Sequence, residues 1–160
     1  MNKNLAIFPG SFDPITLGHV EVIKQSLNIF EKIIIAIGEN YQKNKLFNLN
    51  ERRNLINTVF KNHQNIIIKS YNELTVEFCQ KENCFNIIRG IRNNIDFNYE
   101  HSIAISNNCL DNRINTIFIP STKKTTHISS SIVKEIIANN GDLANFVPNQ
   151  IITDINKMSN

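Results

Sequence analysis

Three segments of this 160-residue chain hold residues that could bind phosphate, and the first is PGSFDPITLGH, residues 9–19. Gly10 lets backbone amides come close to a ligand, and Ser11 places a hydroxyl donor beside them. His19 falls where a helix is expected to begin, and the free N–H groups at a helix N-terminus attract phosphate. His19 could therefore donate a hydrogen bond to a phosphoryl oxygen. The alternative is a tight turn followed by a helix that Thr16 caps.

The second segment is RGIR, which runs from Arg89 to Arg92 and follows an apolar run. Its two guanidinium groups flank a glycine, and the planar fork of an arginine matches the geometry of a phosphate. The alternative is a pair of solvated surface arginines. Asp96 and Glu100 lie four residues apart on one face of the next expected helix. Glu100 could accept a hydrogen bond from a ribose hydroxyl or form an ion pair with an arginine.

The third segment is HISSSIVKE, residues 127–135, which places three serines at an expected helix N-terminus. One hydroxyl would cap that helix, so three indicate a second contact with an anion or a nucleotide. A weaker candidate is the loop QKNKLFNLNERR, in which Lys43 and Lys45 could reach a phosphate. A charged, solvated loop is the alternative interpretation there. Together these segments favour a site for a polyphosphate and a second phosphate.

The sequence excludes several other kinds of site. It contains no visible nucleophile–base pair, no cluster with metal-ligand spacing and no Walker-type loop ending in Lys-Ser or Lys-Thr. We therefore predict no metal site built from side chains and no P-loop phosphotransferase. The formal net charge of +3 is too small to indicate a nucleic-acid surface, but it suits a pocket for a few phosphates.

Composition and length indicate a globular protein, with 41% apolar and 19% charged residues. We expect a single domain over residues 1–160. No apolar run approaches the ~18 residues that a membrane span requires. The short apolar run near the N-terminus breaks at a Pro-Gly pair, so it is not a secretory signal. We expect no membrane association and a cytoplasmic location, where three cysteines would remain free thiols.

Strand-like and helix-like runs alternate along the chain. Short isoleucine-rich runs with little alternation of apolar and polar residues are typical of strands buried on both faces. Their alternation with amphipathic stretches predicts a Rossmann-like α/β fold: a five-stranded parallel sheet with helices on both faces. The expected strands are 4–8, 33–37, 66–69, 86–88 and 116–119, and the expected helices are 17–30, 50–61, 73–82, 96–110, 130–139 and one from about residue 148.

The motifs PGSFDPITLGH, RGIR, DFNYE and ISSSIVKE, taken together, resemble those of the bacterial phosphopantetheine adenylyltransferases, a family of the nucleotidylyltransferase superfamily. The first motif alone indicates only the superfamily, whereas the four at these spacings are specific. The resemblance extends from Ile7 to about Phe146. It implies an enzyme of coenzyme A biosynthesis that uses ATP, 4′-phosphopantetheine and Mg²⁺ and forms dephospho-coenzyme A and pyrophosphate. It also implies a homohexamer that coenzyme A inhibits.

The resemblance further implies roles for individual residues. His19, Lys43 and Arg92 would be catalytic, and His19 would stabilise the transition state. Ser11, Lys43, Thr75 and Arg89 would bind 4′-phosphopantetheine. The ATP site would be lined by Ser11, Phe12, His19, Gly90, Ile91, Arg92, Glu100, Thr125, Thr126, His127, Ile128, Ser129, Ser130 and Ser131.

The chain departs from the family pattern at three positions. Ser11 stands where many members carry Thr, Thr125 where some carry an aromatic residue, and Asn108 where many carry Arg or Lys. The alternatives are another nucleotidylyltransferase, of cytidylyl or nicotinate-mononucleotide type, or a nucleotide-binding module without catalysis. The former typically carry His where Thr16 stands. The latter would not need the full set of His19, Lys43, Arg89 and Arg92.

A phosphate monoester is already ionised at pH 7, so it needs no general base to attack the α-phosphorus of ATP. The expected mechanism is a direct in-line displacement without a covalent enzyme intermediate. This chemistry accounts for a site that is rich in hydrogen-bond donors and holds no evident nucleophile.

Overall fold

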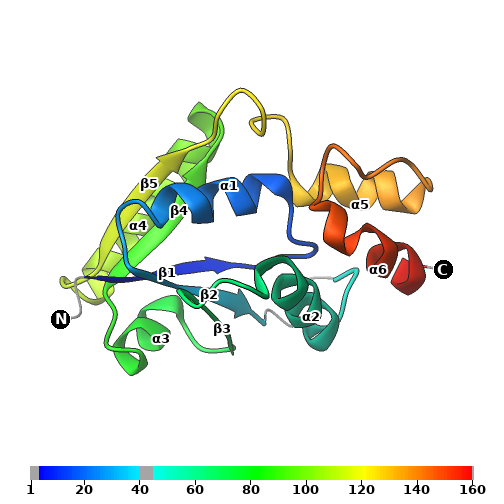
Figure 1. The fold of residues 1–160 in the computed structure, drawn as a ribbon. Helices are drawn as coiled ribbons and strands as arrows, with labels where there is room; N and C mark the ends of the chain where they lie inside the picture. The colour runs from blue at the N-terminus through cyan, green and yellow to red at the C-terminus, as the bar shows by residue number, and fades with distance from the viewer. Residues whose placement is uncertain (1–3, 40–44, 160) are drawn as a thin grey trace.

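The computed structural model of the protein describes residues 4–39 and 45–159. Strands and helices alternate along these residues (Figure 1), as the sequence predicts. In chain order the elements are β1 (Leu5–Gly10), α1 (Leu17–Ser26), β2 (Lys32–Gly38), α2 (Leu49–Phe60), β3 (Ile66–Tyr71), α3 (Thr75–Lys81), β4 (Asn86–Ile91), α4 (Asn94–Leu110), β5 (Asn115–Pro120), α5 (Ser130–Ala138) and α6 (Asn149–Ser159).

The strands form one five-stranded sheet in the order β3-β2-β1-β4-β5, and every adjacent pair is parallel. The chain proceeds from the central β1 outward to β2 and β3, then returns to the other side of β1 for β4 and β5. The order therefore reverses between β1 and β4. In open α/β sheets ligands bind beyond the carboxyl ends of the strands at such a reversal.

Both faces of the sheet are covered, which confirms the predicted fold class. In β2, Ile33 and Ile35 belong to the apolar cluster that packs against α1, α2, α5 and α6. Ile34, between them, belongs to a second cluster with the buried residues of α3. Figure 1 shows α1 and α3 on opposite sides of β1. Isoleucine at consecutive positions thus serves two cores, and this explains why the strand sequences show so little alternation.

Two predicted boundaries were wrong in a way that affects the site. The RGIR segment was expected to follow the fourth strand, but its first three residues belong to β4. They pair there with residues 118–120 of β5. Gly10 was expected after the first strand and is instead the last residue of β1. In both cases hydrogen bonding to a neighbouring strand carries the extended backbone beyond the apolar run.

Helix α1 ends at Ser26, four residues before the predicted end. The side chain of Phe30 is still buried in the core from the loop that follows. The apolar spacing up to Phe30 thus predicted its burial correctly, but the length of the helix was wrong. Among the described residues, Cys79, Cys84 and Cys109 are free thiols. No helix in the described part of the chain is long and apolar enough to cross a membrane.

Gly90 determines how closely α1 approaches β4. A Cβ atom at this position would lie 2.8 Å from Cγ2 of Val22, a β-branched side chain with little rotamer freedom. Gly90→Ala should therefore lower the free energy of unfolding by about 1–3 kcal/mol. Urea denaturation followed by circular dichroism measures this change. The matched control is Gly90→Ala combined with Val22→Ala. This double variant should lose less unfolding free energy than the two single variants lose in total. Strict additivity would contradict the steric explanation.

Candidate functional site

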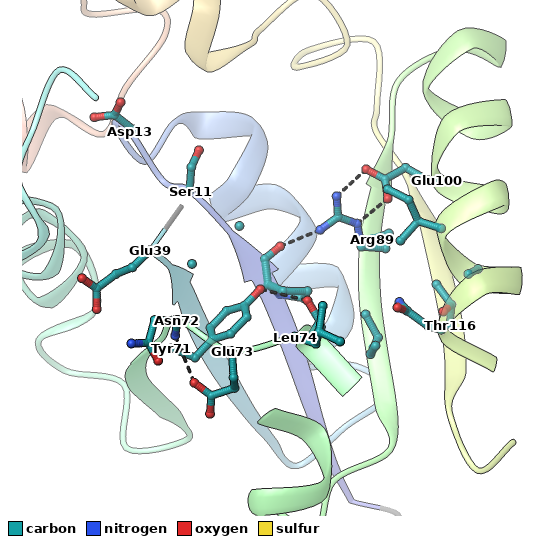
Figure 2. A pocket seen from close by; sticks show the side chains of 18 of the residues that line it. Ser11, Asp13, Glu39, Tyr71, Asn72, Glu73, Leu74, Arg89, Glu100 and Thr116 are labelled. Carbon is teal, nitrogen blue, oxygen red and sulfur yellow. Dashed lines mark hydrogen bonds and ion pairs between the residues drawn. The ribbon is translucent and has the colours of Figure 1, made fainter. Parts of the chain in front are cut away.

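Two adjoining cavities open at the reversal between β1 and β4. The larger has a volume of about 660 Å³ and the smaller about 310 Å³. Figure 2 shows the larger cavity, with Ser11 just after β1 on one side of it and Arg89 and Glu100 on the other. The residues that line both cavities are Pro9, Gly10, Ser11, Arg89 and Glu100. Two ligands bound in the two cavities would therefore meet at Ser11 and Arg89.

Residues at the N-termini of two helices, α1 and α5, line the smaller cavity. His19 lies in the first turn of α1, and Ser129 is the N-cap of α5, where its side chain accepts a hydrogen bond from the N–H of Ile132 at 3.2 Å. Ser130 and Ser131 follow in the same lining. The structure therefore brings together two sets of residues, around His19 and around Ser130, that the sequence separates by more than a hundred positions. Donors and positive dipole ends converge there, as an anion site requires.

His19 is held in one orientation by the cap of its own helix. Its Nδ1 accepts a hydrogen bond from the backbone N–H of Thr16 at 3.0 Å. The Thr16 hydroxyl in turn accepts from the N–H of His19 at 3.4 Å, which completes a capping box. Because Nδ1 is an acceptor, the proton of the neutral ring resides on Nε2. His19 thus has its donor on the nitrogen that the cap leaves free.

The surroundings of His19 keep its ring uncharged at neutral pH. Burial, followed by the positive charges of Arg92 and Arg89, lowers the pKa of His19 to about 4. Nearby cations and a low dielectric both disfavour the charged imidazolium and so favour the neutral ring. The site therefore contains a neutral N–H donor flanked by two permanent cations.

Phe12 packs against the His19 ring and lines neither cavity. Its side chain is fully buried, and its ring centroid lies 5.0 Å from that of His19 in an edge-on arrangement. Its backbone has φ of 47°, in a region that non-glycine residues seldom occupy. Phe8 packs edge-on against Phe12, at 5.5 Å between centroids. The predicted place of Phe12 in the ATP site could thus involve only its backbone.

Arg89 stands between the two cavities and is fully engaged on its protein side. Its Nη1 donates to the Pro9 carbonyl at 2.7 Å, and its Nε donates to Glu100 at 2.5 Å. Its Nη2 forms a second hydrogen bond with the other carboxylate oxygen of Glu100. The sequence left open whether Glu100 contacts a ribose or pairs with an arginine, and in the structure it forms an ion pair with Arg89. That carboxylate holds Arg89 in place and still lines both cavities.

Arg92 lies at the mouth of the smaller cavity, just beyond β4. Its guanidinium donates to Asp96 from Nε at 2.7 Å and from Nη2 at 3.0 Å, and Nη1 donates to the Ile128 carbonyl at 3.3 Å. The hydrogen bonds from Arg92 lower the pKa of Asp96 more than burial raises it. Arg92 is thus tied to the segment that leads into α5.

The remaining residues predicted for ATP divide into two groups. Thr125 and Ile128 line the smaller cavity together with Gly90 and Ile91. Thr126 and His127 are exposed and do not belong to either lining. The Thr126 hydroxyl donates to the Arg92 carbonyl at 3.1 Å, and the His127 ring lies against Phe146.

The larger cavity extends from Ser11 between β3, α3 and α4. Thr75, predicted for the second substrate, lies in its lining, and its hydroxyl is 3.1 Å from the Tyr71 hydroxyl. Lys45 and Lys134 add positive charge. Burial, followed by the charge of Arg52, lowers the pKa of Lys45. Lys43, predicted to be catalytic and to bind this substrate, lies outside the described residues.

Sequence reasoning missed Asp13 and Arg52, two buried charges that support this region. Asp13 accepts from the N–H groups of Phe47 at 2.9 Å and Leu46 at 3.0 Å, and it forms an ion pair with Lys134. Arg52 donates from Nη1 to the Ser11 carbonyl at 2.7 Å. A signal for Arg52 existed, because it lies three and four residues before Leu55 and Ile56, on the apolar face of α2.

The lining provides donors and cations, and most of its acids, though not Glu39, form an ion pair with a cation among the described residues. Glu100 pairs with Arg89, Asp96 with Arg92 and Asp13 with Lys134. In the described residues there is no group of three or more His, Cys, Asp and Glu side chains that could hold a metal ion. Such a lining is suited to anionic ligands that bring their own counter-cation.

Residues 7–136 match the family model described as cytidylyltransferase-like. The phosphopantetheine adenylyltransferase of Flavobacterium psychrophilum is 45% identical over 146 residues, which are 91% of this chain and 96% of that protein. That of Wigglesworthia glossinidia brevipalpis is 43% identical over 98% of this chain and 94% of its own length. That of Vesicomyosocius okutanii is 44% identical over 94% and 96%.

A solved structure shares the fold. It is the crystal structure of a bifunctional NMN adenylyltransferase/ADP ribose pyrophosphatase from Francisella tularensis, complexed with AMP and a Mn ion. It superposes with a TM-score of 0.68 at 15% identity, over 97% of this chain and 48% of that one. The chain thus spans about half of that bifunctional protein, and the likeness concerns the fold alone.

The pKa of His19 predicts how stability changes with pH. In the unfolded chain His19 binds a proton below about pH 6.5, whereas in the folded protein its pKa is about 4. The unfolded state therefore binds more protons in this window, and stability falls as the pH is lowered from 6.5 to 4. His19→Gln keeps a capping acceptor but does not titrate. Unfolding free energies should show the wild type losing stability relative to His19→Gln between pH 7 and pH 5. A difference that does not vary with pH would contradict the assignment.

Proposed function

The chain belongs to the phosphopantetheine adenylyltransferase family of the nucleotidylyltransferases, and we propose that it transfers the adenylyl group of ATP to 4′-phosphopantetheine. The products would be dephospho-coenzyme A and pyrophosphate, in the synthesis of coenzyme A. The observation that carries this proposal is the pair of cavities that share Ser11 and Arg89. A reaction that joins two phosphorylated substrates needs both of them to approach one point.

We assign ATP to the smaller cavity and 4′-phosphopantetheine to the larger. Two helix N-termini and Arg92 favour the triphosphate in the smaller cavity. The larger cavity extends toward Leu74 and Ala104, whose apolar side chains suit an elongated arm behind a phosphate. Ser11, Thr75, Arg89 and Lys43 would bind that second substrate. Ser11 would also contact ATP, because it lines both cavities.

The reaction would proceed by in-line displacement. An oxygen of the acceptor phosphate attacks the α-phosphorus of ATP, a new phosphorus–oxygen bond forms, and the bond from the α-phosphorus to the bridging oxygen breaks. Pyrophosphate carries away the electron pair, and no proton transfer is required. The protein aligns two anions that repel each other and stabilises the charge that develops on the α-phosphate. His19, with its proton on Nε2 and its ring neutral, suits the role of donor to that phosphate.

Mg²⁺ would enter as part of the MgATP substrate. Mg²⁺ is commonly held by substrate phosphates with few protein carboxylates, and the carboxylates of Glu100 and Asp96 already pair with arginines. The bound ion would neutralise charge on the triphosphate. Lys43 and Arg92 would add positive charge from the protein in the proposed reaction.

Three further properties are proposals that rest on this reaction. We propose a cytoplasmic location, a homohexamer, and inhibition by coenzyme A, which resembles the product and would enter the same cavities. One feature supports assembly: α4 exposes large apolar side chains, among them Ile95 at 80%, Tyr99 at 67% and Leu110 at 62%. Exposed apolar surface of this kind marks interaction sites.

Pyrophosphate release tests the reaction directly. The protein should release pyrophosphate from MgATP with 4′-phosphopantetheine and not with water alone, and chelation of Mg²⁺ should abolish the release. Nicotinate mononucleotide as acceptor, or CTP as donor, should give at most a small fraction of that rate. A preference for either would favour the other nucleotidylyltransferase types. Nucleotide binding without any release would favour a module that lacks catalysis.

His19→Ala tests the proposed mechanism. It should lower kcat by on the order of 10²–10³, the scale of losing one preorganised donor to an oxyanion. The affinity for ATP should change much less, because the hydrogen bond strengthens mainly as charge develops. Steady-state kinetics beside calorimetry of ATP binding separates the two effects. A near-normal kcat would exclude the catalytic role, and trapping of an adenylylated His19 would exclude direct displacement.

A further inference from the structure

The segment between β5 and α5 forms one wall of the smaller cavity. Ser121, Thr125 and Ile128 line the cavity from this segment. Within it the N–H groups of Thr125 and Thr126 donate to the Thr122 carbonyl at 3.1 and 3.0 Å. These contacts are local, so they shape a turn but do not fix its position against the sheet. The position must come from contacts with other elements.

On one side the segment is anchored to the residues around Arg92. The Thr126 hydroxyl donates to the Arg92 carbonyl at 3.1 Å, and the Arg92 guanidinium donates to the Ile128 carbonyl at 3.3 Å. The first bond joins two neutral groups, and the second has a charged donor and a neutral carbonyl acceptor. They hold the end of the segment that lies nearer to α5.

On the side of α1 the carboxylate of Glu21 holds the segment, whose first residue, Ser121, also donates its N–H to the Ile91 carbonyl at 2.8 Å. Glu21 of α1 accepts from the Thr122 hydroxyl at 2.6 Å and from the Thr122 N–H at 3.2 Å, and it also accepts from the Thr125 hydroxyl. Burial alone would raise the pKa of Glu21, but the hydrogen bonds from Thr122 and Thr125 outweigh it, so its pKa is lowered. The acceptor is therefore ionised at neutral pH, and hydrogen bonds to an ionised group are stronger than neutral ones.

Glu21 connects a residue that lines the smaller cavity to the helix that carries His19. Thr125, whose hydroxyl donates to Glu21, is buried, at 8% exposure, and also lines the smaller cavity. Glu21 itself does not line either cavity. It lies two residues after His19, on the helix whose N-terminus faces the same cavity. The wall is thus fixed relative to His19 through one short stretch of α1.

We propose that Glu21 is a positioning residue that holds the 121–128 wall against α1 and so sets the affinity of the smaller cavity for its nucleotide. This role rests on the proposed function, which assigns ATP to that cavity. Glu21 does not touch the reacting atoms, so the effect should be on binding, while the chemical step changes little.

Glu21→Ala and Glu21→Gln, each assayed for pyrophosphate release, test the role. The KM for ATP should rise about tenfold in Glu21→Ala, the change expected from losing hydrogen bonds to a charged group. Glu21→Gln should show a smaller increase because one acceptor oxygen remains. In both variants kcat and the KM for 4′-phosphopantetheine should stay within about twofold of the wild type. Glu31→Gln, which removes an exposed carboxylate just beyond α1, is the matched control.

A double-mutant cycle identifies the contact itself. Thr125→Val should raise the KM for ATP, and combining it with Glu21→Ala should add less than the sum of the two changes, because both remove the same hydrogen bond. Amide hydrogen exchange at 122–128 should be faster in Glu21→Ala and should slow again when ATP is added.

The outcomes separate this inference from the proposed function. A wild type that releases no pyrophosphate with any acceptor would refute the function, and the exchange measurement would still report on the anchor. An active wild type with an unchanged KM for ATP in Glu21→Ala would refute the inference alone. A loss confined to kcat and thermal stability would likewise refute it, since that pattern indicates a general structural role.

Discussion

The guanidinium of Arg89 joins the elements between which both cavities open. It belongs to β4, donates to the carbonyl of Pro9 at the end of β1 and pairs with Glu100 on α4. A partly buried cation between two cavities needs such partners, because an uncompensated buried charge costs several kcal/mol. The pairing therefore fixes α4 against the sheet at the point where strand order reverses. It also leaves a positive group facing the place where two anions would meet.

A second set of buried charges supports the turn that follows β1. Asp13 binds the backbone at Leu46 and Phe47, and the nearby Arg52 binds the carbonyl of Ser11. Arg52 is almost completely buried, and its Nε has no hydrogen-bond partner among the described residues. Unpaired buried polar atoms of this kind are costly, so they are few in folded proteins. The backbone that presents Ser11 is thus held by two charges, of which Asp13 lines the larger cavity and Arg52 lines neither.

Much of this arrangement could be predicted from the order of residues along the chain. Runs of isoleucine at consecutive positions indicated strands with two covered faces, and the logic of strand ends placed His19 and the serines of α5 at one edge. The pairing partners could not be predicted in the same way. Glu21 and Thr122 are 101 residues apart, and no periodicity connects them. The same is true of Asp13 and Phe47, whose contact depends on how two loops are folded over one sheet edge.

Since the two cavities share the surface around Ser11 and Arg89, they are one continuous site for a sufficiently long molecule. A compound that fills the smaller cavity and reaches the larger would place its second half at a local concentration in the ~mM range without any new contact. Modest affinity at each end would then multiply into tight binding. The same geometry makes the junction the least tolerant part of such a bisubstrate ligand, because the linker must pass between a hydroxyl and a fixed cation.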